Sequence, residues 1–94
     1  MSDIACDPRT VLIRNQRGLH ARASAKFVQL AESYDAEVSV TKGEQTVGGT
    51  SIMGLMMLAA SPGCEIEVHA TGEQARDALD ALCKLVENRF GEEI

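Results

Sequence analysis

Residues 36–49, AEVSVTKGEQTVGG, decide the class of fold that this sequence can adopt. Apolar and polar residues alternate strictly from Ala36 to Thr41, which is typical of a strand with one buried face and one solvated face. The turn residues 42–44 separate this strand from a second one at 45–49, so the segment predicts a β-hairpin. Residues 64–70, CEIEVHA, repeat the alternation. Strands with one solvated face favour an antiparallel sheet that is covered on its other face only.

Three segments have the pattern of helices, and these helices are expected to cover one face of that sheet. Apolar residues recur with a helical period from Ala21 to Tyr34, which predicts an amphipathic helix. Residues 51–60 predict a short helix, and residues 75–90 predict a long one. With a first strand at residues 10–14, the order of elements is β-α-β-β-α-β-α. This order and the one-faced strands favour an α+β fold with helices on one side of an antiparallel sheet.

The composition excludes several classes of protein. The chain has 94 residues, 45% of them hydrophobic, so a single globular domain spanning residues 1–94 is expected. A net charge of −5 and a complement of one Tyr, two Phe and no Trp argue against a nucleic-acid partner. The N-terminus shows no secretory signal, and the apolar run at residues 52–60 is shorter than the roughly 20 residues that span a bilayer. We therefore expect no membrane partner and a cytoplasmic location.

The cysteines and histidines do not form a pattern of metal ligands. Cys6, Cys64 and Cys83 are an odd set without a C-x-x-C pair, which is typical of reduced thiols in a reducing cytoplasm. Together with His20 and His69, they lack the paired spacing of a metal site. The sequence therefore predicts no metal and no other cofactor.

The charge is distributed unevenly along the chain. Residues 1–31 carry five basic and two acidic groups, a net charge of +3, whereas residues 32–94 carry four basic and twelve acidic groups, a net charge of −8. Residues 8–31 include no acidic residue, and residues 45–64 include no charged residue at all. An acidic protein thus has one basic segment and one neutral, apolar segment, and we expect each to have a function.

His20 is the candidate reactive residue of the basic segment. It lies in the sequence Gly18-Leu19-His20-Ala21-Arg22, directly before the first predicted helix. Unpaired N–H groups at a helix N-terminus bind anions, and the guanidinium of Arg22 can contact the same anion. A neutral imidazole nitrogen can attack a phosphoryl group there. The alternative is a surface residue that only caps the helix. No acidic residue near His20 in the chain is available to orient its ring.

The motif around His20 and a second segment carry a resemblance. GLHAR at residues 18–22 and SIMG at residues 51–54 resemble the two signature segments of the histidine-containing phosphocarrier (HPr) family of the bacterial phosphoenolpyruvate-dependent phosphotransferase system. The resemblance covers residues 8–90. It implies an open-faced sandwich, in which three helices cover one face of a four-stranded antiparallel sheet. It also implies that His20 accepts a phosphoryl group from phospho-Enzyme I and donates it to an Enzyme IIA-type protein.

Two further positions match residues with roles in that family, and one departs from its pattern. Arg22 matches the arginine that accompanies the phosphorylated histidine. Ser51 matches a serine that HPr kinase/phosphorylase phosphorylates in some bacteria, so such a kinase is implied as a further partner. Ala23 stands where the family usually has proline. Because alanine supplies an N–H that proline lacks, the hypothesis is a less rigid loop with an additional donor for a phosphate.

The apolar segment is expected to form a docking surface for partner proteins. A helix as short as the one at residues 51–60 cannot bury every face. If Leu55 and Leu58 turn inward, the other large side chains stay exposed. An exposed surface rich in methionine suits several partners, whereas the alternative is the filling of an irregular core. The side chains expected on this surface are Ile52, Met53 and Met56, to which the resemblance adds Ala21, Ala25, Lys26 and Gln29 from the first helix.

The leading hypothesis is a monomeric phosphoryl carrier that is catalytic only together with its partners. It would serve sugar uptake or the nitrogen-related regulatory branch of the system. A second hypothesis is a regulatory interaction module that docks a target through the Met-rich helix without phosphotransfer. A third and weaker one is a small metal or thiol-redox protein. Only the two ends of the chain, residues 1–6 and 91–94, are expected to fray.

Overall fold

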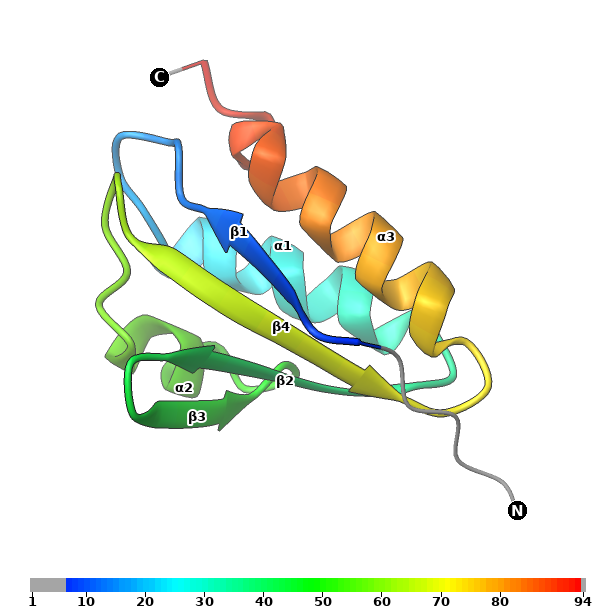
Figure 1. The fold of residues 1–94 in the computed structure, drawn as a ribbon. Helices are drawn as coiled ribbons and strands as arrows, with labels where there is room; N and C mark the ends of the chain where they lie inside the picture. The colour runs from blue at the N-terminus through cyan, green and yellow to red at the C-terminus, as the bar shows by residue number, and fades with distance from the viewer. Residues whose placement is uncertain (1–6, 94) are drawn as a thin grey trace.

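The computed structural model describes residues 7–93, which form a four-stranded antiparallel sheet with helices on one face (Figure 1). The elements in chain order are β1 (Arg9–Leu12), α1 (Ala21–Glu32), β2 (Glu37–Lys42), β3 (Gln45–Gly48), α2 (Ile52–Met57), β4 (Glu65–Thr71), α3 (Ala75–Glu87) and a 3-10 turn, η1 (Arg89–Gly91). The strands lie in the order β1-β4-β2-β3. The predicted α+β class, the open-faced sandwich and the order β-α-β-β-α-β-α are confirmed.

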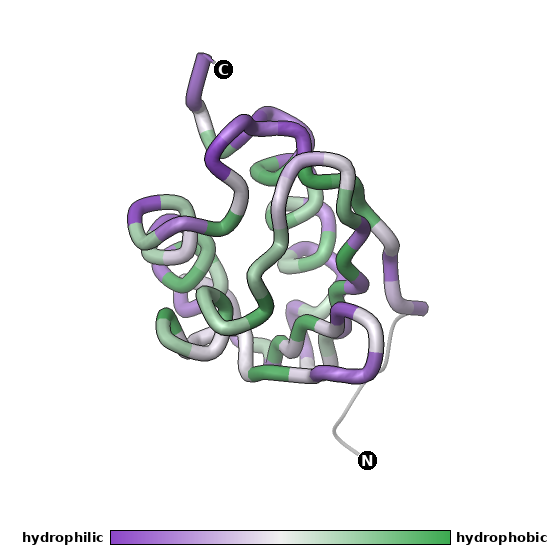
Figure 2. Tube along the Cα trace, turned by 90° about the vertical axis from the view of Figure 1, so that its left-hand side faces the viewer, coloured by the Kyte–Doolittle hydropathy of each residue, from purple (hydrophilic) through white to green (hydrophobic). Residues whose placement is uncertain are grey.

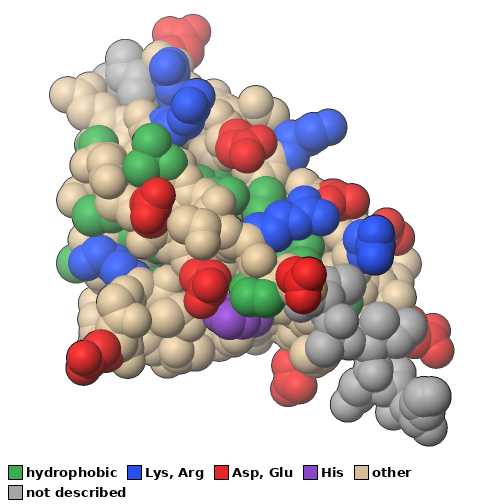
Figure 3. Space-filling model, viewed as in Figure 1, with side chains coloured by type: hydrophobic (Ala, Val, Ile, Leu, Met, Phe, Trp, Pro, Cys, Tyr) green, Lys and Arg blue, Asp and Glu red, His purple; other side chains and the backbone are tan. Residues whose placement is uncertain are grey.

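The register of the sheet follows from the alternation in its strands. In β4, Ile66, Val68 and Ala70 are buried, whereas the residues between them are partly or fully exposed. Val68 lies opposite Arg9 of β1 on one side and Val40 of β2 on the other. A shift of the pairing by one residue would turn these apolar side chains to solvent, so the pattern selects this register. Figure 3 shows the molecule from the side of the sheet, where charged side chains of both signs are interspersed.

The hydrophobic core lies between the sheet and the helices. Figure 2 shows hydrophobic and hydrophilic stretches alternating along the chain, within the helices and strands as well as between them. Phe27 of α1 and Leu79 of α3 are fully buried in this core. Phe90 of η1 is fully buried as well, so the end of the chain is anchored to the same core.

The helix α2 ends earlier than the sequence predicts. Its last residue is Met57 rather than residue 60, because Ala59 has a positive φ of 54° and turns the chain. Leu58 and Ala60 are thereby buried. The carbonyl of Ala60 accepts a hydrogen bond from the N–H of Leu19 (3.0 Å). The turn after α2 therefore supports the loop that precedes α1.

The C-terminal segment differs most from the prediction. The helix α3 ends at Glu87, and η1 follows with positive φ at Arg89 (58°), Phe90 (55°) and Gly91 (80°). The N–H of Glu92 donates to the carbonyl of Arg89 (2.9 Å). The expectation that the chain frays from residue 91 onwards is therefore wrong for Gly91 and Glu92, because hydrogen bonds and the buried Phe90 hold them in place.

The other end that was expected to fray, residues 1–6, lies outside the described residues, and so does Cys6. Of the remaining cysteines, Cys64 is partly exposed and Cys83 is buried, and both are free thiols. Within residues 7–93, no helix combines the length and the hydropathy that crossing a membrane requires. The same residues contain no cluster of three His, Cys, Asp or Glu side chains that could hold a metal ion.

Candidate functional site

His20 caps the N-terminus of α1. Its backbone is extended (φ −73°, ψ −179°), and its carbonyl accepts a helical hydrogen bond from the N–H of Ser24 (2.8 Å). The loop before it turns at Gly18, whose φ is +61°. A Cβ at this position would lie 2.2 Å from the carbonyl oxygen of Ala60, so only glycine fits. The loop therefore places the histidine at the start of the first helix, as the sequence predicts.

The two ring nitrogens of His20 have different partners. Nδ1 accepts a hydrogen bond from the backbone N–H of Arg22 (3.2 Å). Nε2 contacts a carboxylate oxygen of Glu92. The side chains of His20 and Glu92 are only 15% and 17% exposed, so the contact is largely shielded from water. A carboxylate thus orients the ring. The sequence had indicated that no carboxylate was available for this, because no acidic residue lies near His20 in the chain.

Asn15 holds the carboxylate of Glu92 from the other side. The side chain of Asn15 is fully buried, and its Nδ2 donates to the carbonyl of Gly18 (2.8 Å) and to Oε1 of Glu92 (3.0 Å). An atom that faces two acceptors is the amide nitrogen rather than the amide oxygen. One carboxylate oxygen of Glu92 is therefore bonded to Asn15 and the other to His20.

The surroundings of Glu92 favour its charged form. Burial by itself would raise the pKa of this carboxyl. The hydrogen bonds from Asn15 and His20, and electrostatic attraction to His20 and Arg17, outweigh burial and hold the pKa below its ordinary value of 4.5. Glu92 is consequently an anion at neutral pH.

A tight turn after α3 brings Glu92 to His20, and we call residues 88–92 the C-terminal strap. The fully buried Phe90 anchors this strap, and its carbonyl accepts a hydrogen bond from Nζ of Lys26 in α1 (2.7 Å). The left-handed backbone of the non-glycine residues Arg89 and Phe90 costs roughly 1–2 kcal/mol per residue. Such conformations persist only where the surrounding structure imposes them. The strap is therefore held in place by the core and by Lys26.

Basic side chains gather around this end of the molecule. Arg14 and Arg89 line, together with Glu92, a hollow of about 270 Å³. Arg17 is close enough to Glu92 to contribute to the lowering of its pKa. Arg14 and Arg17 of the basic segment thus lie near Glu92, whereas Glu87 lines the same hollow as Arg14. Arg22 is exposed, and within residues 7–93 its guanidinium forms no ion pair, so its contact with a bound anion stays a prediction.

The helix α2 divides into a buried and an exposed face as predicted. Ser51 caps it, with Oγ accepting a hydrogen bond from the N–H of Gly54 (3.0 Å). Leu55 and Leu58 are buried. The exposed fractions are 40% for Ile52, 69% for Met53, 39% for Met56 and 67% for Met57, and these four residues are the docking patch. The predicted exposure of Ile52, Met53 and Met56 is confirmed, Met57 adds to the patch, and the role of the patch in binding partners stays a prediction.

The helix α1 packs against α2 and carries the other residues expected at the docking surface. Ala21 and Gln29 are exposed, and Ala25 is partly buried. Lys26 differs from the expectation in one respect: its ammonium group is engaged by the carbonyl of Phe90 (2.7 Å). Lys26 therefore supports the C-terminal strap in addition to any contact with a partner.

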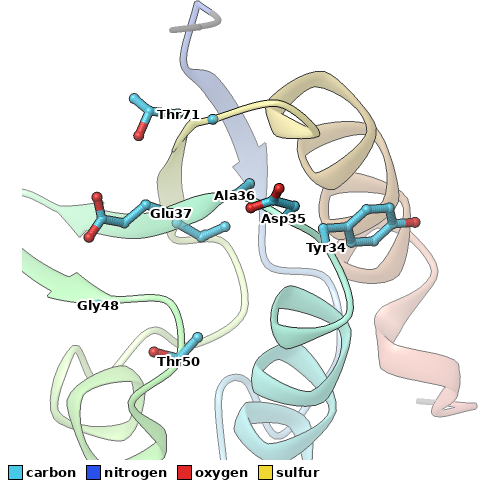
Figure 4. A pocket seen from close by; sticks show the side chains of 9 residues that line it. Tyr34, Asp35, Ala36, Glu37, Gly48, Thr50 and Thr71 are labelled. Carbon is cyan, nitrogen blue, oxygen red and sulfur yellow. The ribbon is translucent and has the colours of Figure 1, made fainter. Parts of the chain in front are cut away.

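A separate pocket of about 540 Å³ lies beyond the C-terminal end of α1. Figure 4 shows it beside the start of β2, with Tyr34, Asp35 and Glu37 among the residues around it. Neither His20 nor Glu92 lines this pocket. It lies at the opposite end of α1 from His20, so it is not part of the histidine site.

Glu92 and Asn15 are the site residues that the sequence-based prediction missed. They lie 77 residues apart in the chain, and neither belongs to a motif that suggests chemistry. The pair Phe90-Gly91 does indicate the end of a helix, since an apolar residue is followed by a glycine. It does not indicate the direction in which the chain continues, and that direction decides where the carboxylate of Glu92 lies.

Known proteins share both the sequence and the fold. The family described as "PTS HPr component phosphorylation site" matches residues 8–88. The chain is 49% identical over 84 residues to phosphocarrier protein HPr of Neisseria meningitidis serogroup A, covering 89% of this chain and 94% of that protein. It is 43% identical over 84 residues to phosphocarrier protein NPr of Shewanella violacea, with 89% and 92% covered.

A solved structure agrees with this assignment. The structure of HPr-C-His from Thermoanaerobacter tengcongensis superposes with a TM-score of 0.89 at 39% identity, covering 95% of this chain and 100% of that chain. The matched family, the relatives and the fold therefore all indicate the same protein family. The histidine at the N-terminus of α1 is consistent with it. The chain belongs to the HPr family of phosphocarrier proteins of the phosphotransferase system.

Proposed function

We propose that this protein accepts a phosphoryl group on Nδ1 of His20 from phospho-Enzyme I and donates it to an Enzyme IIA-type protein. One observation supports this assignment most strongly. Nδ1 faces the N-terminus of α1, where it accepts a hydrogen bond from Arg22, whereas Nε2 is engaged by Glu92. Of the two ring nitrogens, Nδ1 is the one that faces a site for an anion.

The N-terminus of α1 suits the phosphorylated product. The first helical hydrogen bond is donated by Ser24, so the N–H groups of Ala21, Arg22 and Ala23 precede the helical ladder. A phosphoryl group on Nδ1 would replace the contact with Arg22, and its oxygens would accept hydrogen bonds from these groups. The helix dipole and the guanidinium of Arg22 would add electrostatic stabilisation.

The docking patch is the proposed contact surface for both partners. It lies on α2, which packs against α1, and the turn after α2 is bonded to the residue before His20 through the carbonyl of Ala60 and the N–H of Leu19 (3.0 Å). Its methionine side chains are flexible and apolar, which suits the binding of a donor and of an acceptor in turn. The proposal covers the sugar-uptake branch and the nitrogen-related branch, because relatives named HPr and NPr both match this chain.

Ser51 is the proposed regulatory position. A phosphate on its Oγ would add about two negative charges next to the docking patch while remaining at the N-terminus of α2, where it is tolerated. Phosphorylation by HPr kinase/phosphorylase would therefore weaken docking without unfolding the helix.

Phosphoenolpyruvate and Enzyme I provide the test of phosphate acceptance. Incubation should add the mass of one phosphoryl group to the protein, and the modification should be labile in acid. His20→Ala should take up no phosphoryl group, whereas the control His69→Ala should be modified like the wild type, because His69 lies on the sheet and pairs with Glu67 (3.0 Å). An unmodified wild type would favour a regulatory interaction module that uses only the exposed docking patch.

A further inference from the structure

The C-terminal strap ends with a carboxylate on the ring of the reactive histidine. We propose that Glu92 is a positioning residue for phosphotransfer: it holds the proton of His20 on Nε2 and so keeps the lone pair of Nδ1 available for attack. This inference rests on the proposed function of His20. It concerns a residue outside both sequence motifs and 72 residues away from the histidine.

The donors and acceptors around the ring select one tautomer. An ionised carboxylate only accepts hydrogen bonds, so Nε2 must carry the proton where it contacts Glu92. The backbone N–H of Arg22 only donates, so Nδ1 must be unprotonated where it accepts that bond. Both contacts favour the same tautomer. A carboxylate orients the histidine of a catalytic triad in the same way.

The structure holds the carboxylate of Glu92 in a fixed position. Asn15, which is fully buried, binds the oxygen that does not contact His20. The backbone of the strap is fixed by the buried Phe90 and by the hydrogen bond from Lys26. Two consecutive left-handed non-glycine residues, Arg89 and Phe90, are maintained in this turn. The position of Glu92 is therefore set by the protein interior, unlike that of a terminal side chain in solvent.

The forward step has a simple balance of bonds and charge. The lone pair of Nδ1 forms the bond to phosphorus, and the bond from phosphorus to the donor's leaving group breaks, with its electron pair staying on that group. The proton on Nε2 does not move. The ring of His20 becomes a cation, and the adjacent carboxylate of Glu92 compensates that charge.

The bond and charge changes of the first step are reversed at His20 when the phosphoryl group is transferred to the acceptor. The bond between Nδ1 and phosphorus breaks, and its electron pair returns to Nδ1. Because Glu92 has kept the proton on Nε2, the leaving group is a neutral imidazole and not an imidazolate anion. A neutral imidazole is the better leaving group, so Glu92 is expected to assist both the acceptance and the donation of the phosphoryl group.

Glu92→Gln tests the proposal with little change in shape. Glutamine has an NH2 donor in place of one carboxylate oxygen, so it cannot present an acceptor oxygen both at the Asn15 position and at the Nε2 position. We would record ¹⁵N spectra of the imidazole at a pH of about 8.5, where an ordinary histidine is neutral. We would also measure the rate of phosphoryl transfer from Enzyme I. Glu92→Ala provides a second variant, and Glu93→Gln, which removes the charge of an exposed neighbour, is the matched control.

The expected result combines a spectroscopic and a kinetic change. The wild type and Glu93→Gln should show a protonated Nε2, whereas Glu92→Gln and Glu92→Ala should show a mixture of tautomers and transfer about 10-fold more slowly or worse. Unchanged tautomers in both Glu92 variants would overturn the proposal even if transfer slowed. Unchanged rates would overturn it even if the tautomers changed. A wild type that accepts no phosphoryl group would instead refute the function proposed for His20.

Discussion

Nε2 of His20 contacts the carboxylate of Glu92, a residue that lies 72 positions later in the chain. The contact joins the start of α1 to the strap that follows α3. Asn15 donates a hydrogen bond to the other carboxylate oxygen of Glu92. The ring of His20 is thereby held between the stretch that leads into α1 and a strap that follows about 70 residues later.

The hydrogen-bonded carboxylate of Glu92 should make stability depend on pH. The pKa of Glu92 is lower in the folded protein than its ordinary value of 4.5, so the charged form stabilises the fold. This contribution is present above the unfolded value and is lost as the pH falls through the lower, folded value. We expect Glu92→Gln to reduce the free energy of unfolding by roughly 1 kcal/mol at neutral pH. Urea titrations of both proteins at pH values above and below this window would measure the difference. A difference that persisted at the acidic end would contradict the assignment.

The turn before His20 should tolerate only glycine at position 18. Gly18 and Gly43 both have a φ of +61°, but a Cβ at residue 18 would lie 2.2 Å from the carbonyl oxygen of Ala60, whereas a Cβ at residue 43 would meet no atom within 4 Å. Gly43→Ala therefore measures the cost of the backbone conformation alone, about 1–2 kcal/mol. Gly18→Ala adds the clash, so we expect it to lower the free energy of unfolding by roughly 2 kcal/mol more. Equal losses in urea titrations of the two variants would show that no clash arises.

A negative charge at Ser51 should impair docking and spare the fold. Aspartate can cap α2 as serine does, so the melting temperature of Ser51→Asp should stay close to that of the wild type. The rate of phosphotransfer from Enzyme I should fall, because the charge lies beside the apolar docking patch. Gln45→Glu, which adds a charge at an exposed position of β3, is the control and should transfer at the wild-type rate. Equal rates for Ser51→Asp and the wild type would refute this role.

Proline in place of Ala23 should alter the phosphorylated state. Ala23 is fully buried in the first turn of α1, and its N–H precedes the helical ladder. Proline would remove that N–H as a donor to a phosphate on His20 and would stiffen the turn. We expect Ala23→Pro to change the lifetime of phosphohistidine, which acid-quenched mass spectrometry can follow over time. Identical lifetimes and identical transfer rates would count against the hypothesis drawn from this position.

The two described cysteines should differ in reactivity. The hydroxyl of Ser61 forms a hydrogen bond to Cys64 (3.5 Å) that lowers the pKa of this thiol. Burial raises the pKa of Cys83, although the nearby Arg9 opposes that effect. Because the thiolate is the reactive species, iodoacetamide should modify Cys64 at least about tenfold faster than Cys83 at neutral pH. Peptide mass spectrometry would compare the two rates, and Ser61→Ala should slow the labelling of Cys64 alone.

Much of the fold was predictable because it depends on local patterns. The alternation in residues 36–41 and 64–70 selects strands with one buried face, and the helical period of residues 21–34 selects an amphipathic helix. The caps at His20 and Ser51 are also local, since each side chain bonds a backbone N–H two or three residues ahead. The boundaries were less predictable. The early end of α2 at Met57 follows from the burial of Ala60 against the loop of α1, which no short window of sequence reveals.

The sequence by itself determined the class of fold, the position of His20 at a helix N-terminus and the exposure of Ile52, Met53 and Met56, because each depends on local patterns along the chain. Only the tertiary structure decided how the ring of His20 is held. The strap that carries Glu92 owes its direction to the burial of Phe90 and to Lys26, and the carboxylate owes its orientation to the buried Asn15. These contacts join residues more than sixty positions apart, and they form only when the core brings α1 and the end of α3 together.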